Sequence, residues 1–363
     1  MYAVEQFDYT FPDELIAQQP TEPRDHCRLL ILDRELAQIR HQHFYNLVDL
    51  LDESTVLVRN NTRVLPARLF GHKDTGGKCE VLLIHQVSAQ EGLVSWECLT
   101  KPGLRFGQTV TFSTNFSARV RADALETHQN LYTRVLDFNC TDKDFSKYLN
   151  QQGHTPLPPY IAHNVNTEAE LRQSYQTTFA QHIGSVAAPT AGLHFTADLD
   201  KKLEAKGVKI LEVTLHVGLG TFLPVQPEQL MHKTLHQEYF ELTTEVAQQI
   251  NQAKQTGKKI ISVGTTTTRV LESCAQHGQV VAQSGSTQLF IQPGDRFQII
   301  DGLITNFHVP RSSLLMLVSA LVSAPNTSHP FSEFAVSAMG KAYLEAVAHR
   351  YRLFSFGDAM LIW

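Results

Sequence analysis

This sequence is poor in cysteine and in charged residues, and it has no long hydrophobic run. Its five cysteines, Cys27, Cys79, Cys98, Cys140 and Cys274, are scattered and never spaced as Cys-x-x-Cys. That pattern excludes a thiolate metal site and fits a reducing compartment. No apolar stretch is long enough to span a bilayer, and the N-terminus lacks a basic segment followed by an apolar one. We therefore expect a cytoplasmic protein with no membrane partner.

The charge balance limits the kinds of partner. Charged residues make up only 18% of the chain and the formal net charge is −5, which argues against bulk electrostatic nucleic-acid binding as the main role. A local basic groove remains compatible with these numbers. The 42% of hydrophobic residues excludes a disordered chain, and 363 residues suggest about two domains.

The predicted secondary structure changes along the chain. Residues 66–154 read as short β-type runs separated by Gly, Asn and Ser, which predicts a small antiparallel β-barrel. From residue 155 onward, helical patterns alternate with apolar strands, as at 197–206, 208–217, 244–256 and 259–263. The predicted fold class is α/β: a discontinuous α/β domain (1–65 and 155–363) with a mostly parallel sheet and an inserted barrel domain (66–154).

The most informative stretch is Gly184 to Thr196, reading GSVAAPTAGLHFT. Small residues there allow close approach of backbone and ligand, and Gly192 also tolerates a positive φ. His194 is titratable, and Thr196 is a good N-cap for the helix that follows. The pattern predicts a ligand loop with an acid or base at a helix entrance; a tight turn with a buried histidine is the alternative.

Three other segments carry Gly, Thr or His just after a predicted strand. The run from Gly264 to Arg269 (GTTTTR) opens a helix and can bind an anion through backbone N–H groups, or its threonines can simply cap the helix. The run from Leu215 to Phe222 (LHVGLGTF) has the same strand-then-glycine form. Asn306 and His308 alternate onto one face near the end of another strand. Because ligands sit beyond the carboxyl ends of parallel strands, a shared pocket is predicted, although His308 alone reads as a core histidine.

Three further segments are weaker candidates for a functional site. His232, His236 and Glu238 are compatible with zinc, but the His-Glu-x-x-His pattern is absent, so contacts with substrate or positions on the polar surface are favoured. The polar run from Asn60 to Arg68 either binds a phosphate or carboxylate or forms a hinge into the barrel. The apolar C-terminal segment predicts a docked strand, with Asp358 as a turn residue or a site acid.

Taken in order, the strings GSVAAPTAGLHFT, LHVGLGTF, VGTTTTR, LITNFHVPRSSLLMLVSA and YRLFSFGDAMLI give the sequence a close resemblance to a known family. From Phe7 to the C-terminus, the chain resembles the S-adenosylmethionine:tRNA ribosyltransferase-isomerases of queuosine biosynthesis. The resemblance implies a discontinuous α/β domain with an inserted barrel. It also implies transfer and isomerisation of the ribosyl group of S-adenosylmethionine onto 7-aminomethyl-7-deazaguanine at the tRNA wobble position. The product is epoxyqueuosine, with release of adenine and methionine.

The implied chemistry assigns roles to residue types. A C–H beside a sulfonium is acidic, so a base is needed at the ribose 5′ carbon, and adenine needs a proton donor on departure. We expect proton transfer by His194 and His308, with Asp358 as a third candidate catalytic residue; the resemblance does not say which imidazole is acid and which is base. The expected substrate-binding residues are Asn60, Thr62, Arg63, Arg68, Thr190, Gly192, His216, Gly218, Gly220, Thr221, Thr265, Thr267, Arg269 and Asn306. No metal and no cofactor are expected, because S-adenosylmethionine is a consumed cosubstrate.

Two expectations concern details of this chain. Members of the family typically read Asn-Asp-Thr where this chain has Asn60-Asn61-Thr62, and an amide can neither balance a sulfonium nor act as a base. The tRNA is expected across the groove between the two domains, on residues such as Arg63, Arg68, Lys101 and Arg105. The rival functions are a metal-dependent hydrolase and a non-catalytic RNA-binding module. The oligomeric state is not indicated.

Overall fold

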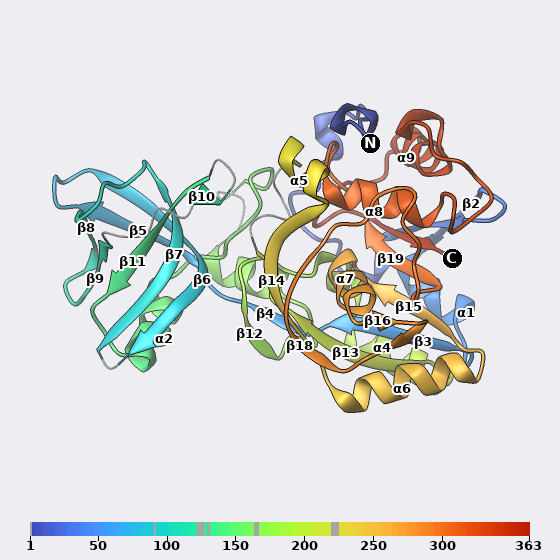
Figure 1. Ribbon diagram of the computed structural model, residues 1–363, viewed down its shortest axis with the longest axis horizontal. Helices are drawn as coiled ribbons and strands as arrows, with labels where there is room; N and C mark the ends of the chain where they lie inside the picture. The colour runs from blue at the N-terminus through green and yellow to red at the C-terminus, as the bar shows by residue number, and fades with distance from the viewer. Residues whose placement is uncertain (1, 91, 122–126, 129–130, 163–166, 219–224) are drawn as a thin grey trace.

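The computed structural model describes the whole chain except residues 1, 91, 122–126, 129–130, 163–166 and 219–224. It has two parts, a small β-barrel and a larger α/β part, joined near the strands β4 (Thr62–Val64) and β12 (His182–Ser185) (Figure 1). No helix in the described ranges is long and apolar enough to cross a membrane.

The α/β part is built on a nine-stranded sheet with the order β18-β14-β13-β3-β15-β19-β20-β1-β2. Its four central strands are parallel and supply the apolar runs that the sequence predicts; they are β13 (Lys209–Leu215), β3 (Thr55–Asn60), β15 (Lys259–Val263) and β19 (Gly302–Asn306). The flanking strands are β14 (Thr234–Leu242), β18 (Gln283–Leu289), β20 (Ala359–Ile362), β1 (Arg28–Asp33) and β2 (Gln38–His43). Of these, β20 lies antiparallel to β19 and parallel to β1, so the C-terminal segment is a docked strand as predicted.

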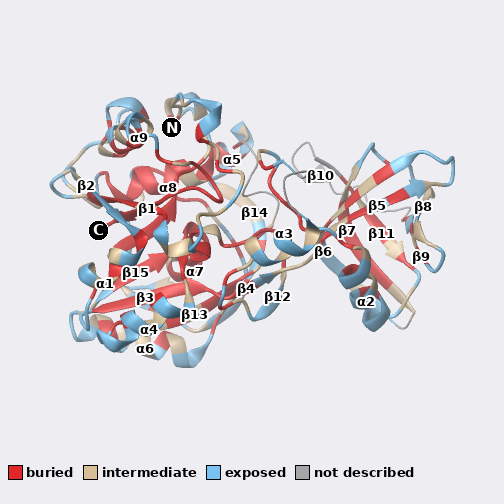
Figure 2. Ribbon diagram, turned by 180° about the vertical axis from the view of Figure 1, so that it is seen from behind, coloured by how far each residue is buried: buried red, intermediate tan, exposed pale blue. Residues whose placement is uncertain are grey.

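Helices cover both faces of this sheet, because successive residues of a buried strand point to opposite sides. Val56 and Val58 of β3 join the core that contains α6 (Thr244–Gln255), α7 (Thr265–Ser273), α8 (Ser313–Leu321) and α9 (Ala338–Ala348). Leu57 joins the opposite core, beneath α1 (Leu47–Leu50) and α4 (Ala197–Ala205). The four central strands are mostly buried between these two layers of helices (Figure 2).

Hydroxyl caps fix several helix starts, as the sequence predicts. The Thr196 side chain accepts a hydrogen bond from the Leu199 N–H at the start of α4, and the side chains of Thr243 and Ser312 do the same for α6 and α8.

The remaining helices described are α2 (Asp142–Gln152), α3 (Glu168–Ser174) and α5 (Pro227–His232), and a short 3-10 helix (Thr190–His194) carries the end of the small-residue motif. Minor hairpin strands are β16 (Ala275–Gln276) and β17 (Gln279–Val280).

The barrel is antiparallel and closed, since β11 pairs with both β7 and β9. Its strands are β5 (Arg68–Lys73), β6 (Lys78–Gln90), β7 (Leu93–Lys101), β8 (Thr109–Ser113), β9 (Phe116–Val120) and β11 (Leu131–Phe138), with β10 (Thr127–His128) at the rim. Phe145 and Leu149 of α2 pack into the barrel core. The predicted fold class is confirmed, whereas the domain boundaries at 65/66 and 154/155 stay a prediction.

Candidate active site

The loops that follow the central parallel strands meet the small-residue motif at one edge of the sheet, as the topology predicts. They enclose a cavity of about 40 Å³. The described residues that line it are Ala188, Pro189, Thr190, Ala191, Val217, Gly264, Thr265, Thr266, Thr305, Asn306, His308 and Leu314. Segments from four of the resemblance strings therefore converge on one small space.

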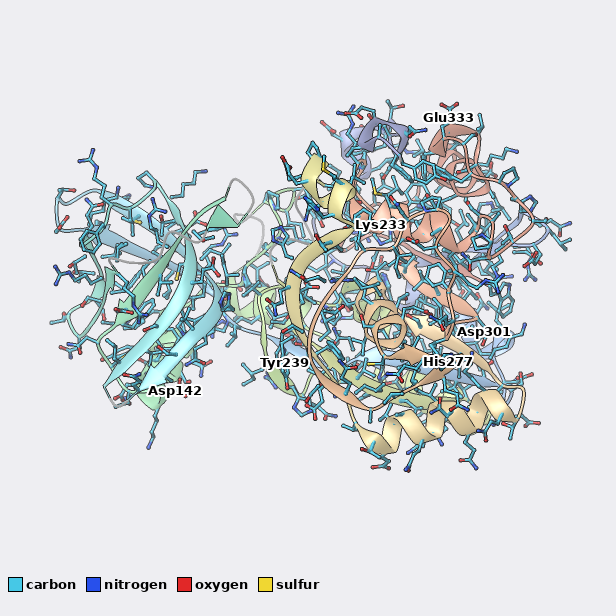
Figure 3. The ribbon with its side chains drawn as sticks, in the orientation of Figure 1. Asp142, Lys233, Tyr239, His277, Asp301 and Glu333 are labelled. Atoms are coloured by element: carbon cyan, nitrogen blue, oxygen red, sulfur yellow. The ribbon has the colours of Figure 1, made fainter. Side chains whose placement is uncertain are left out.

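A larger groove of about 600 Å³ lies beside this cavity, between the barrel and the edge of the sheet. Val217 lines both spaces. The barrel contributes His85, Trp96 and Glu97, and the sheet side contributes His216, Glu238 and Tyr239 among others; Figure 3 shows Tyr239 on β14. The groove falls within the usual size range of small-molecule sites.

Asn306 occupies the centre of the polar network behind the cavity. Its side-chain amide donates to His194 Nε2 at 3.1 Å and to the Phe354 carbonyl at 3.1 Å. Its Oδ1 atom is buried and has no hydrogen-bond partner among the described residues. Because a buried acceptor without a partner is costly, this oxygen is suited to receive a donor from a ligand.

His194 lies behind Asn306 and does not itself line either cavity. With the Asn306 amide donating to Nε2, the ring proton is on Nδ1, which lies 3.2 Å from Cys27 Sγ. Burial, with smaller contributions from Arg24 and Arg352, lowers the pKa of His194 to about 3. The ring is therefore neutral at physiological pH and holds the Asn306 side chain in place.

His308 lines the cavity directly and is also buried. Its Nε2 lies 3.1 Å from Thr305 Oγ1, and its Nδ1 lies 3.3 Å from the Tyr343 hydroxyl. Burial lowers the pKa of His308 to about 3. A neutral imidazole can accept a proton but has none to spare as an acid, so in the protein without ligands neither histidine is a general acid.

The start of α7 supplies backbone donors to the same cavity. Gly264 has φ +87°, a conformation that favours glycine, and the first hydrogen bond of the helix runs from Thr268 N–H to the Gly264 carbonyl. The N–H groups of Thr265 and Thr266 precede that bond and have no partner within the helix. The Thr267 hydroxyl instead donates a hydrogen bond to the Val263 carbonyl at 2.8 Å, so this side chain contacts the backbone and does not line the cavity.

Arg269 lies behind the residues that line the groove. It forms a buried ion pair with Glu238, and its Nε donates to the Leu289 carbonyl at 3.1 Å. Glu238 in turn accepts from the Gly218 N–H at 2.8 Å. This chain of contacts fixes Gly218, where the backbone leaves β13, so Arg269 positions the groove wall and does not line it. Gly220 and Thr221, which follow, lie outside the described residues.

Asn60 and Thr62 connect β3 to the neighbouring strand. The Asn60 side chain bonds both the N–H and the carbonyl of Leu215 and reaches Thr266 Oγ1 at 3.3 Å, so it joins strands rather than facing the groove. Thr62 Oγ1 lies 2.9 Å from Nδ1 of His216, whose ring does line the groove. A Cβ at Gly184 would come within 2.6 Å of that ring, which explains the glycine there.

Other predicted site residues lie away from the two cavities. Asp358 is buried and accepts from the backbone N–H groups of Arg28 and Arg352 and from the Arg28 guanidinium, so it joins β1 to the C-terminal segment. Arg68 pairs with Glu80 at 3.1 Å at the base of the barrel. Arg63 is exposed and lines a separate depression of about 160 Å³.

The expectation that Gly192 needs a positive φ is wrong. Its φ lies outside the positive range in which glycine is favoured, and a Cβ there would lie 2.8 Å from the Phe179 ring. Close packing in the interior requires this glycine, not an unusual backbone angle. Thr190 from the same motif does line the cavity.

The histidine pair that was compatible with zinc does not share a helix face. His232 ends α5, whereas His236 and Glu238 belong to strand β14. Glu238 is the ion-pair partner of Arg269. Of the three residues, His236 and Glu238 line the groove and His232 does not.

The sequence reasoning missed the barrel's contribution to the groove. Trp96 is buried and its Nε1 has no hydrogen-bond partner in the described parts of the chain. Glu97 next to it is 3% exposed at its side chain and pairs with His85 Nδ1 at 2.9 Å. A carboxylate within an otherwise apolar strand (LVSWECLTK) was the available signal for Glu97.

Asn61 is held by neighbours that suit an amide. Its Nδ2 donates to Glu212 Oε2 at 3.4 Å, and its Oδ1 accepts from the Thr214 hydroxyl at 2.8 Å. The same Glu212 carboxylate also binds Arg59 and Gln181. An aspartate at position 61 would place a second carboxylate against Glu212.

We therefore expect Asn61→Asp to give no gain in turnover and to lower the free energy of unfolding by roughly 1–3 kcal/mol. Urea denaturation and a turnover assay measure the two effects. The double variant Asn61→Asp with Glu212→Gln should recover most of the lost stability, because one of the two facing charges is removed. A faster Asn61→Asp enzyme would show instead that the carboxylate is needed for full activity.

The sequence model of the queuosine biosynthesis protein family matches residues 4–362. S-adenosylmethionine:tRNA ribosyltransferase-isomerases from Carboxydothermus hydrogenoformans and Fusobacterium nucleatum are 47% and 45% identical; the alignments cover 98% of this chain and 98% and 96% of the relatives. The crystal structure of S-adenosylmethionine tRNA ribosyltransferase from Thermotoga maritima is 33% identical, with a TM-score of 0.53 and 99% of this chain and 100% of that one covered. The chain belongs to the queuosine biosynthesis protein family.

Proposed function

We propose that this protein transfers and isomerises the ribosyl group of S-adenosylmethionine onto 7-aminomethyl-7-deazaguanine at the wobble position of tRNA. The products are epoxyqueuosine-tRNA, adenine and methionine. The observation that carries the proposal is identity of 45–47% over nearly the full chain to S-adenosylmethionine:tRNA ribosyltransferase-isomerases. S-adenosylmethionine is consumed as a cosubstrate, and the reaction needs no further cofactor. A tRNA substrate also fits the cytoplasmic location that the sequence predicts.

The cosubstrate lies across the two connected spaces. The small cavity, about 40 Å³, has room for only a few ligand atoms, whereas the groove of about 600 Å³ can hold a nucleoside. The methionine carboxylate binds the N–H groups of Thr265 and Thr266 at the start of α7, where the helix dipole favours an anion. The sulfonium faces the groove, where the Glu97 carboxylate favours a cation, whereas the Glu238 carboxylate is already paired with Arg269.

His308 is the proton acceptor nearest to the cosubstrate. It is neutral, it lines the cavity, and its ring is oriented by Thr305 and Tyr343. A base in this position removes a proton from the ribose carbon beside the sulfonium. Asn306 offers its unpaired Oδ1 to a donor on the cosubstrate, and His194 acts through Asn306 as a positioning residue.

The target base enters the groove from the barrel side. Trp96 offers an unpaired indole N–H and an aromatic surface, and Glu97 offers a carboxylate to the donor groups of a guanine-like base. The exposed side chains of Arg63, Lys101 and Arg105 bind phosphates of the tRNA. In this arrangement the aminomethyl group of the base approaches the ribose of the cosubstrate.

One assay tests the function. The protein is incubated with S-adenosylmethionine and tRNA that carries the aminomethyl base, and free adenine and methionine are measured against tRNA with an unmodified guanine at that position. We expect equal amounts of the two products with the modified tRNA alone. Binding of tRNA with no adenine release would favour a non-catalytic RNA-binding module, and activity lost to a chelator would favour a metal-dependent enzyme.

A further inference from the structure

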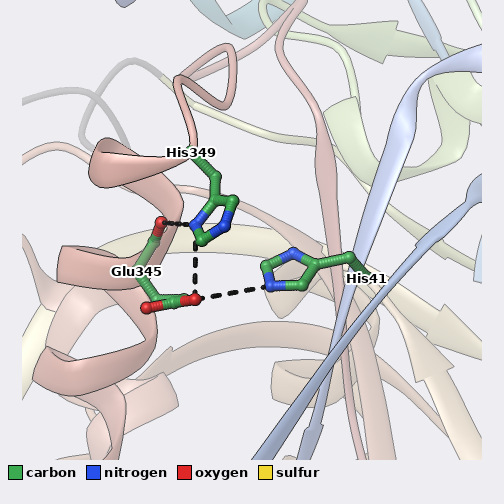
Figure 4. A group of neighbouring side chains, drawn as sticks. All are labelled: His41, Glu345 and His349. Carbon is green, nitrogen blue, oxygen red and sulfur yellow. Dashed lines mark hydrogen bonds and ion pairs between the residues drawn. The ribbon is translucent and has the colours of Figure 1, made fainter.

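A group of two imidazoles and one carboxylate lies outside both cavities, where the edge strand β2 meets the end of α9. His41 comes from β2, Glu345 from the last turn of α9, and His349 caps the C-terminus of that helix (Figure 4). One ligand atom from each lies within 4.8 Å of the other two. The group plays no part in the proposed reaction, because none of its members lines the cavity or the groove.

The spacing of these atoms matches a tetrahedral metal site. Metal–nitrogen and metal–oxygen bonds near 2.0–2.2 Å at a tetrahedral angle put neighbouring ligand atoms about 3.4 Å apart. Glu345 Oε1 lies 3.6 Å from His41 Nε2 and 3.2 Å from His349 Nδ1. The exposed His349 ring contacts the Glu345 carbonyl at 3.1 Å. A small rotation of the ring away from that contact brings the remaining pair of ligand atoms, on His41 and His349, to a similar spacing.

The His41 ring is oriented as ligand imidazoles usually are. Its other nitrogen, Nδ1, lies 2.8 Å from the buried Tyr351 hydroxyl. With the proton on Nδ1 donated to that oxygen, the Nε2 lone pair points at Glu345. Hydrogen bonds of this kind fix the tautomer and direction of metal-binding histidines.

The local charges allow a cation here. The Arg28 guanidinium stacks on the Tyr351 ring and pairs with Asp358 at 3.0 Å, and Arg350 pairs with Glu14 at 3.6 Å. The C-terminus of α9 adds the negative end of a helix dipole. Glu345 therefore meets no unpaired arginine among these neighbours.

We propose that His41, Glu345 and His349 bind one divalent transition-metal ion of the zinc, cobalt or nickel class and thereby link β2 to α9. Two nitrogen donors and one oxygen donor favour these ions over magnesium or calcium, which prefer oxygen ligands. Solvent water completes the coordination. The site is structural: it joins the edge of the sheet to the last helix.

The test titrates the reduced, metal-free full-length protein with Co²⁺, followed by visible absorption, and with Zn²⁺, followed by calorimetry. The free thiols also bind metals, so the measured quantity is the difference between the protein and its variants. We expect the unchanged protein to bind one more equivalent than His41→Ala or His349→Ala. Tyr351→Phe should bind that equivalent about 10–100-fold more weakly. Zinc should raise the melting temperature of the unchanged protein and of neither alanine variant.

His43→Ala is the matched control, because His43 is an exposed histidine on the same strand. It should keep the additional equivalent and the zinc-dependent shift in melting temperature. The proposal is overturned if the alanine variants bind as much metal as the unchanged protein, or if His43→Ala loses as much as His41→Ala. Equal binding by Tyr351→Phe and the unchanged protein would contradict the role given to Tyr351.

Discussion

Replacing His308 with glutamine should lower the rate of adenine release by about 10²–10⁴-fold, the usual contribution of a positioned general base. His308 is the imidazole that lines the cavity, and glutamine can still hydrogen-bond to Thr305 or Tyr343. The rate is measured at saturating cosubstrate and modified tRNA, so that weaker binding does not mimic slower chemistry. His277→Gln, at the exposed turn labelled in Figure 3, is the control and should turn over normally. A His308→Gln enzyme that keeps most of its rate would remove this residue from the mechanism.

The same variant should also change how the free energy of unfolding depends on pH. The pKa of His308 is lowered from 6.5 to about 3 by burial, so below pH 6.5 the unfolded chain takes up a proton that the folded protein does not. Stability therefore falls as the pH drops from 6.5 towards 3, by up to about 1.4 kcal/mol per pH unit for this group. His308→Gln should flatten the dependence by that amount between pH 6 and pH 4. An unchanged slope would mean that the His308 ring is accessible to protons in the folded protein.

Replacing Arg269 with methionine should lower the free energy of unfolding by about 3–5 kcal/mol, because it leaves the Glu238 carboxylate buried without its cation. Both side chains of the pair are 5% exposed or less. Urea denaturation measures the loss. The exposed pair Lys233–Asp295 provides the control, and Lys233→Met should cost at most about 1 kcal/mol.

A second substitution separates the charge from the packing. Glu238→Gln removes the charge and can still accept the hydrogen bond from the Gly218 N–H. The double variant Arg269→Met with Glu238→Gln should therefore recover most of the stability lost in Arg269→Met. Additive losses in the two single variants would show that the two side chains stabilise the fold independently.

The architecture and the convergence of the site could be predicted because both depend on local patterns. Apolar runs such as β15 are followed at once by Gly264 and threonines, and parallel strands bring their ends to one edge. The strands β2 and β5 were not predicted: β2 is almost wholly exposed, so its sequence, QIRHQH, shows no alternation of apolar and polar residues.

The partners of the site residues could not be predicted, because they come from distant positions. Arg269 was expected among the substrate-binding residues, but its guanidinium pairs with Glu238, 31 residues away in sequence. Asp358 was a candidate acid by its place in the C-terminal string, but its carboxylate accepts hydrogen bonds from Arg28, 330 residues away, as well as from the nearby Arg352 N–H. Spacing identifies the residue types that can do chemistry, and long-range pairing decides which of them face the cavity.

The contact between Arg68 and His154 has a consequence for how the molecule was assembled. The backbones of these two residues exchange hydrogen bonds of 3.1 and 2.7 Å, so the chain enters and leaves the barrel side by side. A segment whose ends already touch can be gained or removed by a single genetic insertion or deletion without displacing the flanking strands. A protein with a short loop in place of the barrel would keep the sheet intact and would lack the barrel side of the groove.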